Sequence, residues 1–219
     1  MADWKSIRAV VFDMDGVIFD SERATFNEWK ELADRYGLKD VEIPYMRCVG
    51  VNAMRSKEIF LDFYGADFPY DAYAQEVSVS YHGRYDGGRL PMKPGVRPLL
   101  ESLRAKGLYI ALASSTREAT VRSQLEDAGL LAFFDRVVGG DMIARSKPAP
   151  DIFLAAVEGT GIPPADCAVI EDSFNGIRAA HAAGMAPIMV PDMLPPDDEM
   201  RALAESIQPD LNAVRALLG

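Results

Sequence analysis

Five short runs of apolar residues occur along the chain without the alternation of apolar and polar positions that marks a half-exposed strand. Uninterrupted apolar runs of this length are typical of strands that are buried on both faces of a parallel sheet. The pattern therefore predicts five strands. They span residues 9–12, 109–113, 136–138, 167–170 and 187–190, and the run at 136–138 is the shortest.

Between these runs, apolar residues recur at the three- and four-residue spacing of helices. The clearest case is Val96, Leu99 and Leu103, after which Gly107 is placed to end the helix. Strands that alternate with helices indicate a doubly wound α/β domain. The other predicted helices lie near 121–128, 152–157 and 177–183, with one last helix that starts at 195–199.

A region of a different kind follows the first strand. Its apolar stripes are helical and rich in aromatic residues, including Phe26, Trp29 and Phe60. A connection between a strand and a helix in an α/β domain normally takes only about 2–6 residues. A segment as long as this one must be an inserted helical domain. We therefore expect an α/β core formed by residues 1–19 and 91–219, with a helical domain at 20–90 inserted into it.

The composition is acidic, with a net charge of −10. Such an excess argues against a surface that binds nucleic acid or an anionic membrane. It leaves room for a small anionic substrate in a local basic pocket. We expect a monomer, with a dimer as the alternative, because no apolar stripe requires a partner.

The cellular location follows from three further features. No apolar run reaches the ~18–20 residues that span a bilayer, and residues 1–10 lack the apolar centre of a signal peptide. Cys48 and Cys167 lie far apart and form no Cys-x-x-Cys motif, which argues against both a disulfide framework and zinc on cysteine. The sequence thus predicts a protein of the reducing cytoplasm.

Polar residues follow several of the predicted strands at the point where each strand ends. In a doubly wound sheet, ligands bind beyond the carboxyl ends of the strands, so we expect these side chains to converge on one edge. They supply carboxylates, hydroxyls and one lysine. They are Asp13 and Asp15; Ser114, Ser115 and Thr116; Lys147; and Glu171 and Asp172.

The two aspartates after the first strand suit phosphoryl transfer. Asp13 can act as a carboxylate nucleophile, and it would then form an aspartyl-phosphate and divide a difficult displacement into two easier ones. Asp15 would protonate the departing alcohol and later deprotonate the hydrolytic water. Lys147 and Ser114 would hold the phosphoryl oxygens and balance their charge, and Gly16 and Ser115 are the further phosphate-binding residues.

Carboxylates alone would repel a phosphate, which calls for a divalent cation that prefers oxygen ligands. Mg²⁺ is the simplest choice. The expected ligands are Asp13, the backbone carbonyl of Asp15, and Asp172, with Glu171 as a further candidate. The substrate class that follows is a small phosphorylated metabolite.

These residues resemble the four motifs of the haloacid dehalogenase superfamily. Residues 12–20 (FDMDGVIFD) are similar to its first motif, Ser114 to the second, Lys147 to the third, and residues 171–176 (EDSFNG) to the fourth, in the same order. The resemblance implies a Rossmann-like core with a five-stranded parallel sheet, a type-1 helical cap at the insertion, Mg²⁺ dependence and an aspartyl-phosphate.

The resemblance also sorts the branches of that superfamily. Dehalogenating members lack the second aspartate of the first motif, so Asp15 favours phosphoryl transfer. The branch that looks most similar joins β-phosphoglucomutase to phosphatases of small metabolites. The mutase carries a cap histidine where this chain has Thr25, and cap lysine and arginine residues where this chain has residues 48–53 (CVGVNA). These departures favour a phosphatase for sugar phosphates or related monoesters. A sugar phosphomutase is the alternative, and a non-catalytic binding protein is the second.

Simpler roles compete for individual residues. Asp13 would then only cap a turn, and Lys147 would be a solvated loop residue. Ser114 is a candidate helix cap, although Thr116 is the stronger one. The convergence of four loops favours the catalytic interpretation. The remaining candidates are assigned no role in the chemistry: Arg55 and Lys57 on a helix surface, His82 and His181 without a visible partner, and 175–176 as a helix start.

Overall fold

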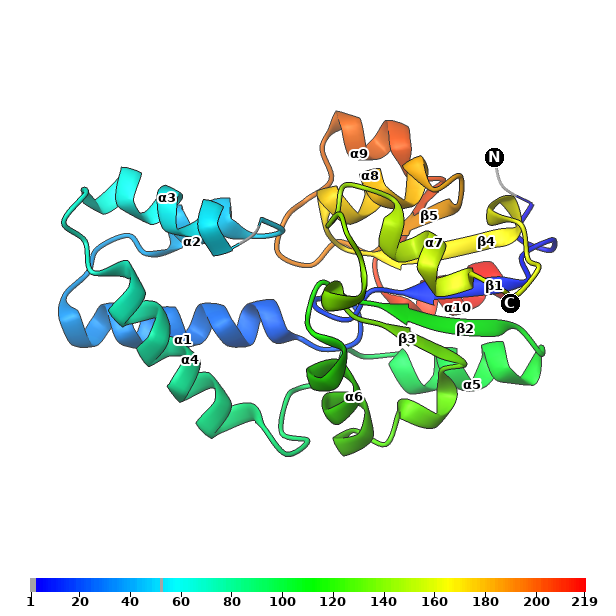
Figure 1. Ribbon diagram of the computed structural model, residues 1–219, viewed down its shortest axis with the longest axis horizontal. Helices are drawn as coiled ribbons and strands as arrows, with labels where there is room; N and C mark the ends of the chain where they lie inside the picture. The colour runs from blue at the N-terminus through cyan, green and yellow to red at the C-terminus, as the bar shows by residue number, and fades with distance from the viewer. Residues whose placement is uncertain (1–2, 52) are drawn as a thin grey trace. The chain divides into compact units, whose positions relative to one another are not determined.

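The computed structural model describes residues 3–51 and 53–219. The first two residues of segment 1–10 and Asn52 of segment 48–53 lie outside that description. The chain forms two compact units, one from residues 1–19 and 92–219 and the other from residues 20–91 (Figure 1). Within the described residues, no helix combines the length and the apolar character needed to cross a membrane.

The first unit contains a parallel sheet in the order β3-β2-β1-β4-β5-β6. The apolar runs form its centre because every residue of β1, β4 and β5 is buried between helices. In register, Val11 lies opposite Ala111 on one side and Val169 on the other. The strands are β1 (Ala9–Phe12), β2 (Tyr109–Ala113), β3 (Arg136–Val138), β4 (Cys167–Glu171), β5 (Ala186–Met189) and β6 (Ser206–Ile207).

The sheet has six strands, one more than expected. The added strand, β6, consists of Ser206 and Ile207 alone and pairs with Ile188 and Met189 at the edge of the sheet. Both of its residues are only half-buried, so they form no apolar run. A two-residue edge strand of this kind leaves no hydrophobic pattern in the sequence.

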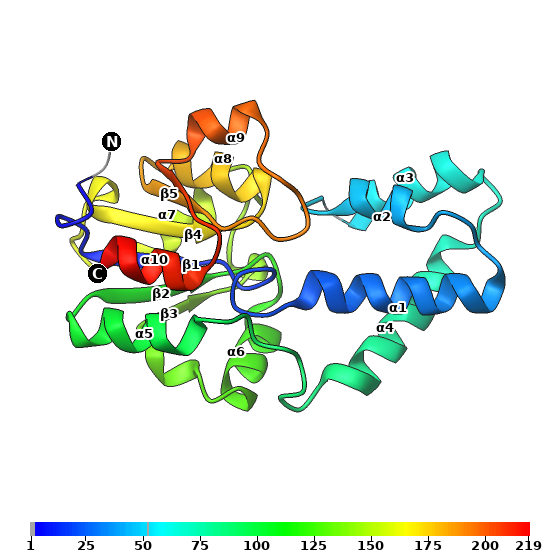
Figure 2. The ribbon, with the colours of Figure 1, turned by 180° about the vertical axis from the view of Figure 1, so that it is seen from behind.

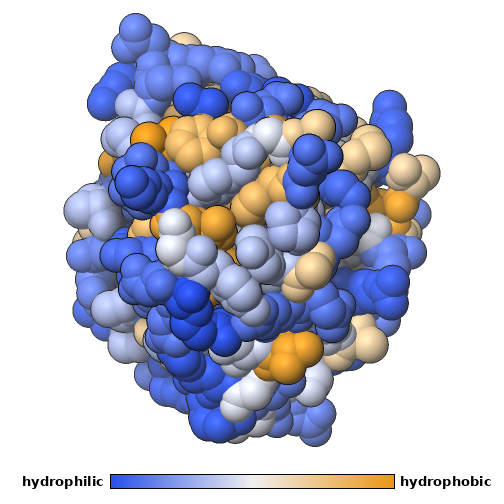
Figure 3. All heavy atoms as spheres, turned by 90° about the vertical axis from the view of Figure 1, so that its left-hand side faces the viewer, coloured by the Kyte–Doolittle hydropathy of each residue, from blue (hydrophilic) through white to orange (hydrophobic). Residues whose placement is uncertain are grey.

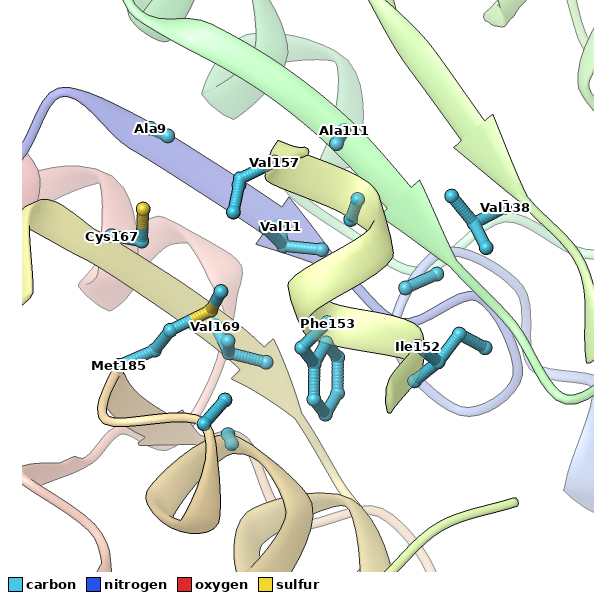
Figure 4. Packing of buried hydrophobic residues seen from close by; sticks show 14 of the residues in the cluster. Ala9, Val11, Ala111, Val138, Ile152, Phe153, Val157, Cys167, Val169 and Met185 are labelled. Atoms are coloured by element: carbon cyan, nitrogen blue, oxygen red, sulfur yellow. The ribbon is translucent and has the colours of Figure 1, made fainter. Parts of the chain in front are cut away.

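Helices cover both faces of the sheet. On one face, Ile152 and Phe153 of α7 pack with Val11, Ala111 and the remaining members of one buried cluster (Figure 4). On the other face, α5 and α10 lie side by side (Figure 2). The helices of this unit are α5 (Val96–Ala105), α6 (Glu118–Asp127), α7 (Asp151–Val157), α8 (Phe174–Ala182), α9 (Asp198–Leu203) and α10 (Leu211–Leu218).

The C-terminal region contains two helices, whereas the sequence predicted one. The helix start expected at 195–199 is α9, whose first turn is capped by Asp197, which accepts a hydrogen bond from the Met200 N–H at 2.8 Å. After β6, Asp210 accepts hydrogen bonds from the N–H groups of Asn212 and Ala213 and starts α10. The signal that could have identified this second helix was Asp210 followed by apolar residues at helical spacing, Leu211, Val214 and Leu218.

The second unit is helical and has an aromatic core. The Trp29 ring lies 4.6 Å from the Phe60 ring and 5.8 Å from the Tyr70 ring, measured between centroids. Each aromatic ring buries a large apolar area, so rings of this kind contribute strongly to the core of a small unit. Its helices are α1 (Ser21–Tyr36), α2 (Glu42–Cys48), α3 (Ala53–Tyr64) and α4 (Tyr70–Tyr85).

A buried carboxylate also joins α1 to α4. Glu28 is 2% exposed, accepts a hydrogen bond from the Ser80 hydroxyl at 2.5 Å, and lies 3.2 Å from Arg84 Nη1. The same arginine makes a two-pronged ion pair with Glu31. A buried charge persists only when it is paired in this way. Ala24, Glu28 and Leu32 recur at four-residue spacing on the buried face of α1, so periodicity places Glu28 among apolar residues but does not identify its partners on α4.

The charged residues considered in the insertion all have partners. Arg55 pairs with Glu58 at 2.7 Å, and Lys57 pairs with Asp71 at 2.5 Å. The expectation that His82 lacks a partner is wrong, because its Nδ1 lies 3.0 Å from Asp86 Oδ1, one helical turn further on. Figure 3 shows hydrophilic side chains over most of the face on view, with hydrophobic residues interspersed among them.

Candidate active site

The predicted site residues occupy the carboxyl edge of the central strands. Phe12 is in register with Leu112 of β2 and Ile170 of β4. Since all three strands run in parallel, the residues that follow these positions lie at the same edge of the sheet. Asp13, Ser114 and Asp172 are therefore brought together by the register. Lys147 reaches the same edge from the segment between β3 and α7.

Lys147 is shared between two carboxylates. Its Nζ lies 2.5 Å from Asp13 Oδ1 and 2.6 Å from Glu171 Oε1, and all three side chains are at least nine-tenths buried. The ammonium group also lies 5.0 Å from the centroid of the Phe153 ring, within the range of a cation–π contact. A buried ammonium group needs such partners, because an unpaired charge would not remain in the interior.

The protonation of this group reflects its burial and its charges. Burial raises the pKa of Asp13 well above its usual value, Lys147 acts in the opposite direction, and Glu171 and Asp15 raise it again. Burial on its own lowers the pKa of Lys147, but the two carboxylates outweigh it and the net shift is upward. Lys147 is thus a cation at neutral pH, in a site with more carboxylates than one lysine neutralises.

Glu171 uses both of its carboxylate oxygens. Oε1 accepts a hydrogen bond from Lys147, and Oε2 accepts one from the Ser173 N–H at 2.7 Å. A Cβ at Gly176 would lie only 1.8 Å from Glu171 Oε1, so the carboxylate fits because position 176 has no side chain. Gly176 therefore does more than start α8, contrary to the simplest interpretation of 175–176. It makes room for Glu171, the partner of Lys147.

Three carboxylates gather beside the lysine. Asp13, Glu171 and Asp172 each offer an oxygen, these oxygens lie within 4.8 Å of one another, and all three residues are buried. Gly16 has a φ of +81°, and a Cβ there would lie 2.2 Å from Asp172 Oδ2. Three buried carboxylates beside one ammonium group leave excess negative charge. The donor set and this charge fit a hard divalent cation such as Mg²⁺.

Two hydroxyl groups hold the second aspartate of the first motif. Ser114 Oγ and Thr116 Oγ1 both donate to Asp15 Oδ2, at 3.3 and 3.2 Å. Ser114 Oγ in turn accepts a hydrogen bond from the Thr116 N–H at 3.1 Å. Ser115, between them, is exposed. The structure thus brings Ser114 to Asp15, and Ser115 stays a predicted phosphate contact.

The interpretation of Thr116 as a helix cap is wrong. Helix α6 begins at Glu118, and the Glu118 N–H donates a hydrogen bond to Asp141 Oδ1 at 2.9 Å. Asp141 follows Gly139 and Gly140, and a Cβ at Gly140 would lie 2.2 Å from the Ser115 carbonyl oxygen. A Gly-Gly-Asp sequence directly after a predicted strand was the signal that could have identified this close contact between loops.

Comparisons with known proteins agree with this architecture. The chain is 32% identical over 182 residues to the phosphorylated carbohydrates phosphatase of Thermotoga maritima, covering 83% of this chain and 84% of that protein. It is 34% identical over 196 residues to beta-phosphoglucomutase of Bacillus subtilis, covering 84% and 83%. It is also 34% identical over 209 residues to the Arabidopsis thaliana chloroplastic protein Suppressor of Quenching 1. That match covers 86% of this chain but only 18% of the Arabidopsis protein.

Solved structures give the same result. The structure of a HAD family hydrolase from Deinococcus radiodurans, which contains bound phosphate and sodium, superposes with a TM-score of 0.80 at 26% identity. The match covers 98% of this chain and 96% of that one. The family model described as haloacid dehalogenase-like hydrolase matches residues 7–184, which include all four motif positions. The chain therefore belongs to the haloacid dehalogenase-like hydrolase family.

Proposed function

We propose that this protein is a Mg²⁺-dependent phosphatase that hydrolyses a small phosphorylated metabolite, a sugar phosphate or a related monoester. The observation that carries the proposal is the buried group in which Lys147 lies between Asp13 and Glu171, next to Asp172. This group supplies a nucleophile, a cation for phosphoryl oxygens and a cluster of metal ligands. The relative named as a phosphatase of phosphorylated carbohydrates supports the substrate class.

The reaction proceeds in two displacements at phosphorus. In the first, a carboxylate oxygen of Asp13 forms a bond to phosphorus while the bond to the ester oxygen breaks, and Asp15 gives that oxygen its proton. In the second, Asp15 takes a proton from water, the water oxygen bonds to phosphorus, and the bond to Asp13 breaks. The products are an alcohol and inorganic phosphate, and both aspartates return to their starting states.

The other residues of the core bind the phosphoryl group and balance its negative charge. Lys147 and Ser114 contact its oxygens, and Gly16 and Ser115 complete the phosphate contacts. Mg²⁺ would be held by Asp13, Asp172 and the backbone carbonyl of Asp15. When bound, it offsets the repulsion between the phosphate and the carboxylates.

The main role that we assign to Glu171 is to hold Lys147, and binding of the metal is its second role. Both of its oxygens already accept hydrogen bonds, one from Lys147 and one from the Ser173 N–H. A carboxylate used in this way orients the lysine and adds negative charge close to the metal. Asp172 belongs to the same group of oxygens and is the ligand that we propose first.

We assign recognition of the leaving group to the helical domain at 20–90, because the core groups recognise only phosphate and metal. Thr25 and segment 48–53 lack the basic residues that would hold a bisphosphate for reorientation, which favours hydrolysis. We propose a cytoplasmic monomer, in keeping with two cysteines that form no disulfide.

A phosphomutase is the second candidate. It is favoured by the 34% identity to beta-phosphoglucomutase and by the Glu171–Asp172 pair. The same core chemistry would then return the phosphoryl group to a bisphosphate intermediate instead of to water. The two candidates differ in product, since only the phosphatase accumulates inorganic phosphate.

The test is phosphate release from a panel of phosphorylated sugars, nucleotides and small acids, with and without Mg²⁺. The Asp13→Asn variant is assayed beside the wild type. Metal-dependent release that is lost in the variant supports the phosphatase and identifies its substrate class. Conversion of glucose 1-phosphate to glucose 6-phosphate after priming with a bisphosphate, without phosphate release, would instead support the mutase.

A further inference from the structure

The hydroxyl of Thr116 contacts a carboxylate on which the proposed reaction depends. Thr116 Oγ1 lies 3.2 Å from Asp15 Oδ2, the same oxygen that Ser114 Oγ contacts at 3.3 Å. None of the four motif positions includes Thr116. Two donors that converge on one carboxylate oxygen fix its direction more closely than either one would alone.

We propose that Thr116 is a positioning residue that holds the Asp15 carboxylate in the orientation for proton transfer to and from the substrate. The proposal rests on the proposed function, because it needs Asp15 to act as acid and base. Thr116 acts through Asp15 alone and makes no contact with phosphate in this role. Ser114, by contrast, is assigned to contact both the Asp15 carboxylate and the phosphoryl oxygens of the substrate.

The backbone of Thr116 is fixed on both sides, and this fixes the hydroxyl. Its N–H donates to Ser114 Oγ at 3.1 Å, and its carbonyl accepts a hydrogen bond from the Gly140 N–H at 2.9 Å. Threonine is β-branched, so its χ1 angle is restricted once the backbone is set. The hydroxyl therefore points at Asp15 with little loss of side-chain freedom.

A hydroxyl is suited to a partner that gains and loses a proton. It donates to a carboxylate, and after rotation it accepts from a carboxylic acid. An ammonium, a guanidinium or a backbone N–H group could donate only. Thr116 thus keeps its hydrogen bond to Asp15 in both half-reactions, in one of which Asp15 is the acid and in the other the base.

The dependence of rate on the leaving group tests this role. The nitrophenolate of p-nitrophenyl phosphate departs without a proton, whereas the alkoxide of an alkyl phosphate needs one from Asp15. We expect Asp15→Asn to lower kcat/KM for the alkyl phosphate by about 10²-fold or more and to spare kcat/KM for p-nitrophenyl phosphate, because kcat/KM reports only the first displacement. The kcat of this variant should fall for both substrates, because the second displacement needs Asp15 as the base whatever the leaving group. Thr116→Val should show the same selectivity with a smaller loss, on the order of tenfold.

The controls separate positioning from folding. Thr116→Ser keeps the hydroxyl and should restore the leaving-group dependence of the wild type, and Thr116→Ala should behave like Thr116→Val. Thr120→Val makes the same chemical change at an exposed position of α6. Thermal unfolding of each variant is measured in parallel, so that rates are compared only between folded proteins.

Each outcome decides one of the two proposals. If Thr116→Val and Thr116→Ala lower kcat/KM equally for both substrates, or leave both unchanged, the positioning role is overturned. If Asp13→Asn retains the wild-type rate, the proposed function fails whatever the threonine variants do. If Asp13→Asn loses activity and Asp15→Asn shows the expected dependence of kcat/KM on the leaving group while Thr116→Val does not, only the positioning role fails.

Discussion

Lys147 Nζ lies 2.5 Å from Asp13 Oδ1, with both side chains more than nine-tenths buried. This contact joins the residue assigned as nucleophile to the only side-chain cation placed beside it among the described residues. Because Glu171 holds the same lysine from the other side, loss of the ammonium group would leave two carboxylates facing each other in the interior. The contact therefore affects both stability and chemistry.

Replacement of Lys147 by Met should lower the free energy of unfolding in metal-free buffer by about 3 kcal/mol, because one partner of a buried ionic group is removed. Phosphate release should fall below detection. Denaturant titration measures the first effect. Lys57→Met is the matched control: it breaks an exposed ion pair with Asp71 and should cost no more than about 1 kcal/mol. Equal losses in the two variants would contradict the assignment.

Replacement of Gly176 by Ala should destabilise the protein by about 2 kcal/mol, because a Cβ there overlaps the Glu171 carboxylate. The displaced carboxylate would also release Lys147, so activity should fall. Gly83 in α4 offers the opposite case, since nothing lies within 4 Å of a Cβ built there. Gly83→Ala should therefore stabilise the protein by about 0.5–1 kcal/mol through helix propensity. The two melting temperatures should move in opposite directions, and a neutral Gly176→Ala would refute the close approach.

Binding of Mg²⁺ should stabilise the wild type against denaturant by about 2.7 kcal/mol at one hundred times the dissociation constant. The effect follows from a site that exists only when Asp13 and Asp172 are brought together by folding. Removal of the ion with a chelator should reverse the gain. Asp172→Asn should abolish most of it, whereas Asp127→Asn at an exposed position of α6 should not. A gain that persists in Asp172→Asn would place the ion elsewhere.

The two cysteines should differ in reactivity. Burial raises the pKa of the Cys167 thiol from 9.0 to about 11, and burial also raises the pKa of Cys48, which is half-exposed. At about pH 8, iodoacetamide should therefore modify Cys48 slowly and Cys167 only after unfolding. Mass spectrometry of the modified peptides would show the order, and early modification of Cys167 would contradict its burial.

The same shift gives a sign for the pH dependence of stability. The folded state holds the Cys167 proton more tightly than the unfolded state, so its contribution is complete below the usual thiol pKa of 9.0 and is lost as the pH rises through about 11. The free energy of unfolding should fall over this interval by less in Cys167→Ala than in the wild type. If the free energy of unfolding falls with pH by the same amount in both proteins, Cys167 does not contribute to this pH dependence.

Much of the core could be predicted because its signals are local and apolar. The runs at 9–12, 109–113 and 136–138 coincide with strands β1, β2 and β3, since a strand buried on both faces must be apolar throughout. The edge strand β6 and the last helix, α10, were missed. Strand β6 leaves no apolar run because its two residues are half-buried, whereas α10 does have the signals of a helix, namely the Asp210 cap and apolar residues at 211, 214 and 218.

The convergence of the candidate site residues on one edge of the sheet was predictable from the sequence, but their hydrogen-bond partners were not. The order of the strands brings Asp13, Lys147 and Asp172 to one edge, and this follows from parallel topology. Three of these hydrogen bonds join segments that lie far apart in the sequence. They are the bond from Lys147 to Glu171, the bond from Thr116 to Asp15, and the bond from the Glu118 N–H to Asp141 at the start of α6. Periodicity carries no information about such contacts.

The most direct test of the account is to look for the phosphoryl group on Asp13 itself. The wild-type protein is mixed with substrate and Mg²⁺, quenched with acid within the first turnover, digested and examined by mass spectrometry. We predict an acyl phosphate on the peptide that contains Asp13, sensitive to hydroxylamine and missing from the Asp13→Asn variant. Phosphate release with no such adduct, or turnover by Asp13→Asn at the wild-type rate, would contradict the role of Asp13 as nucleophile.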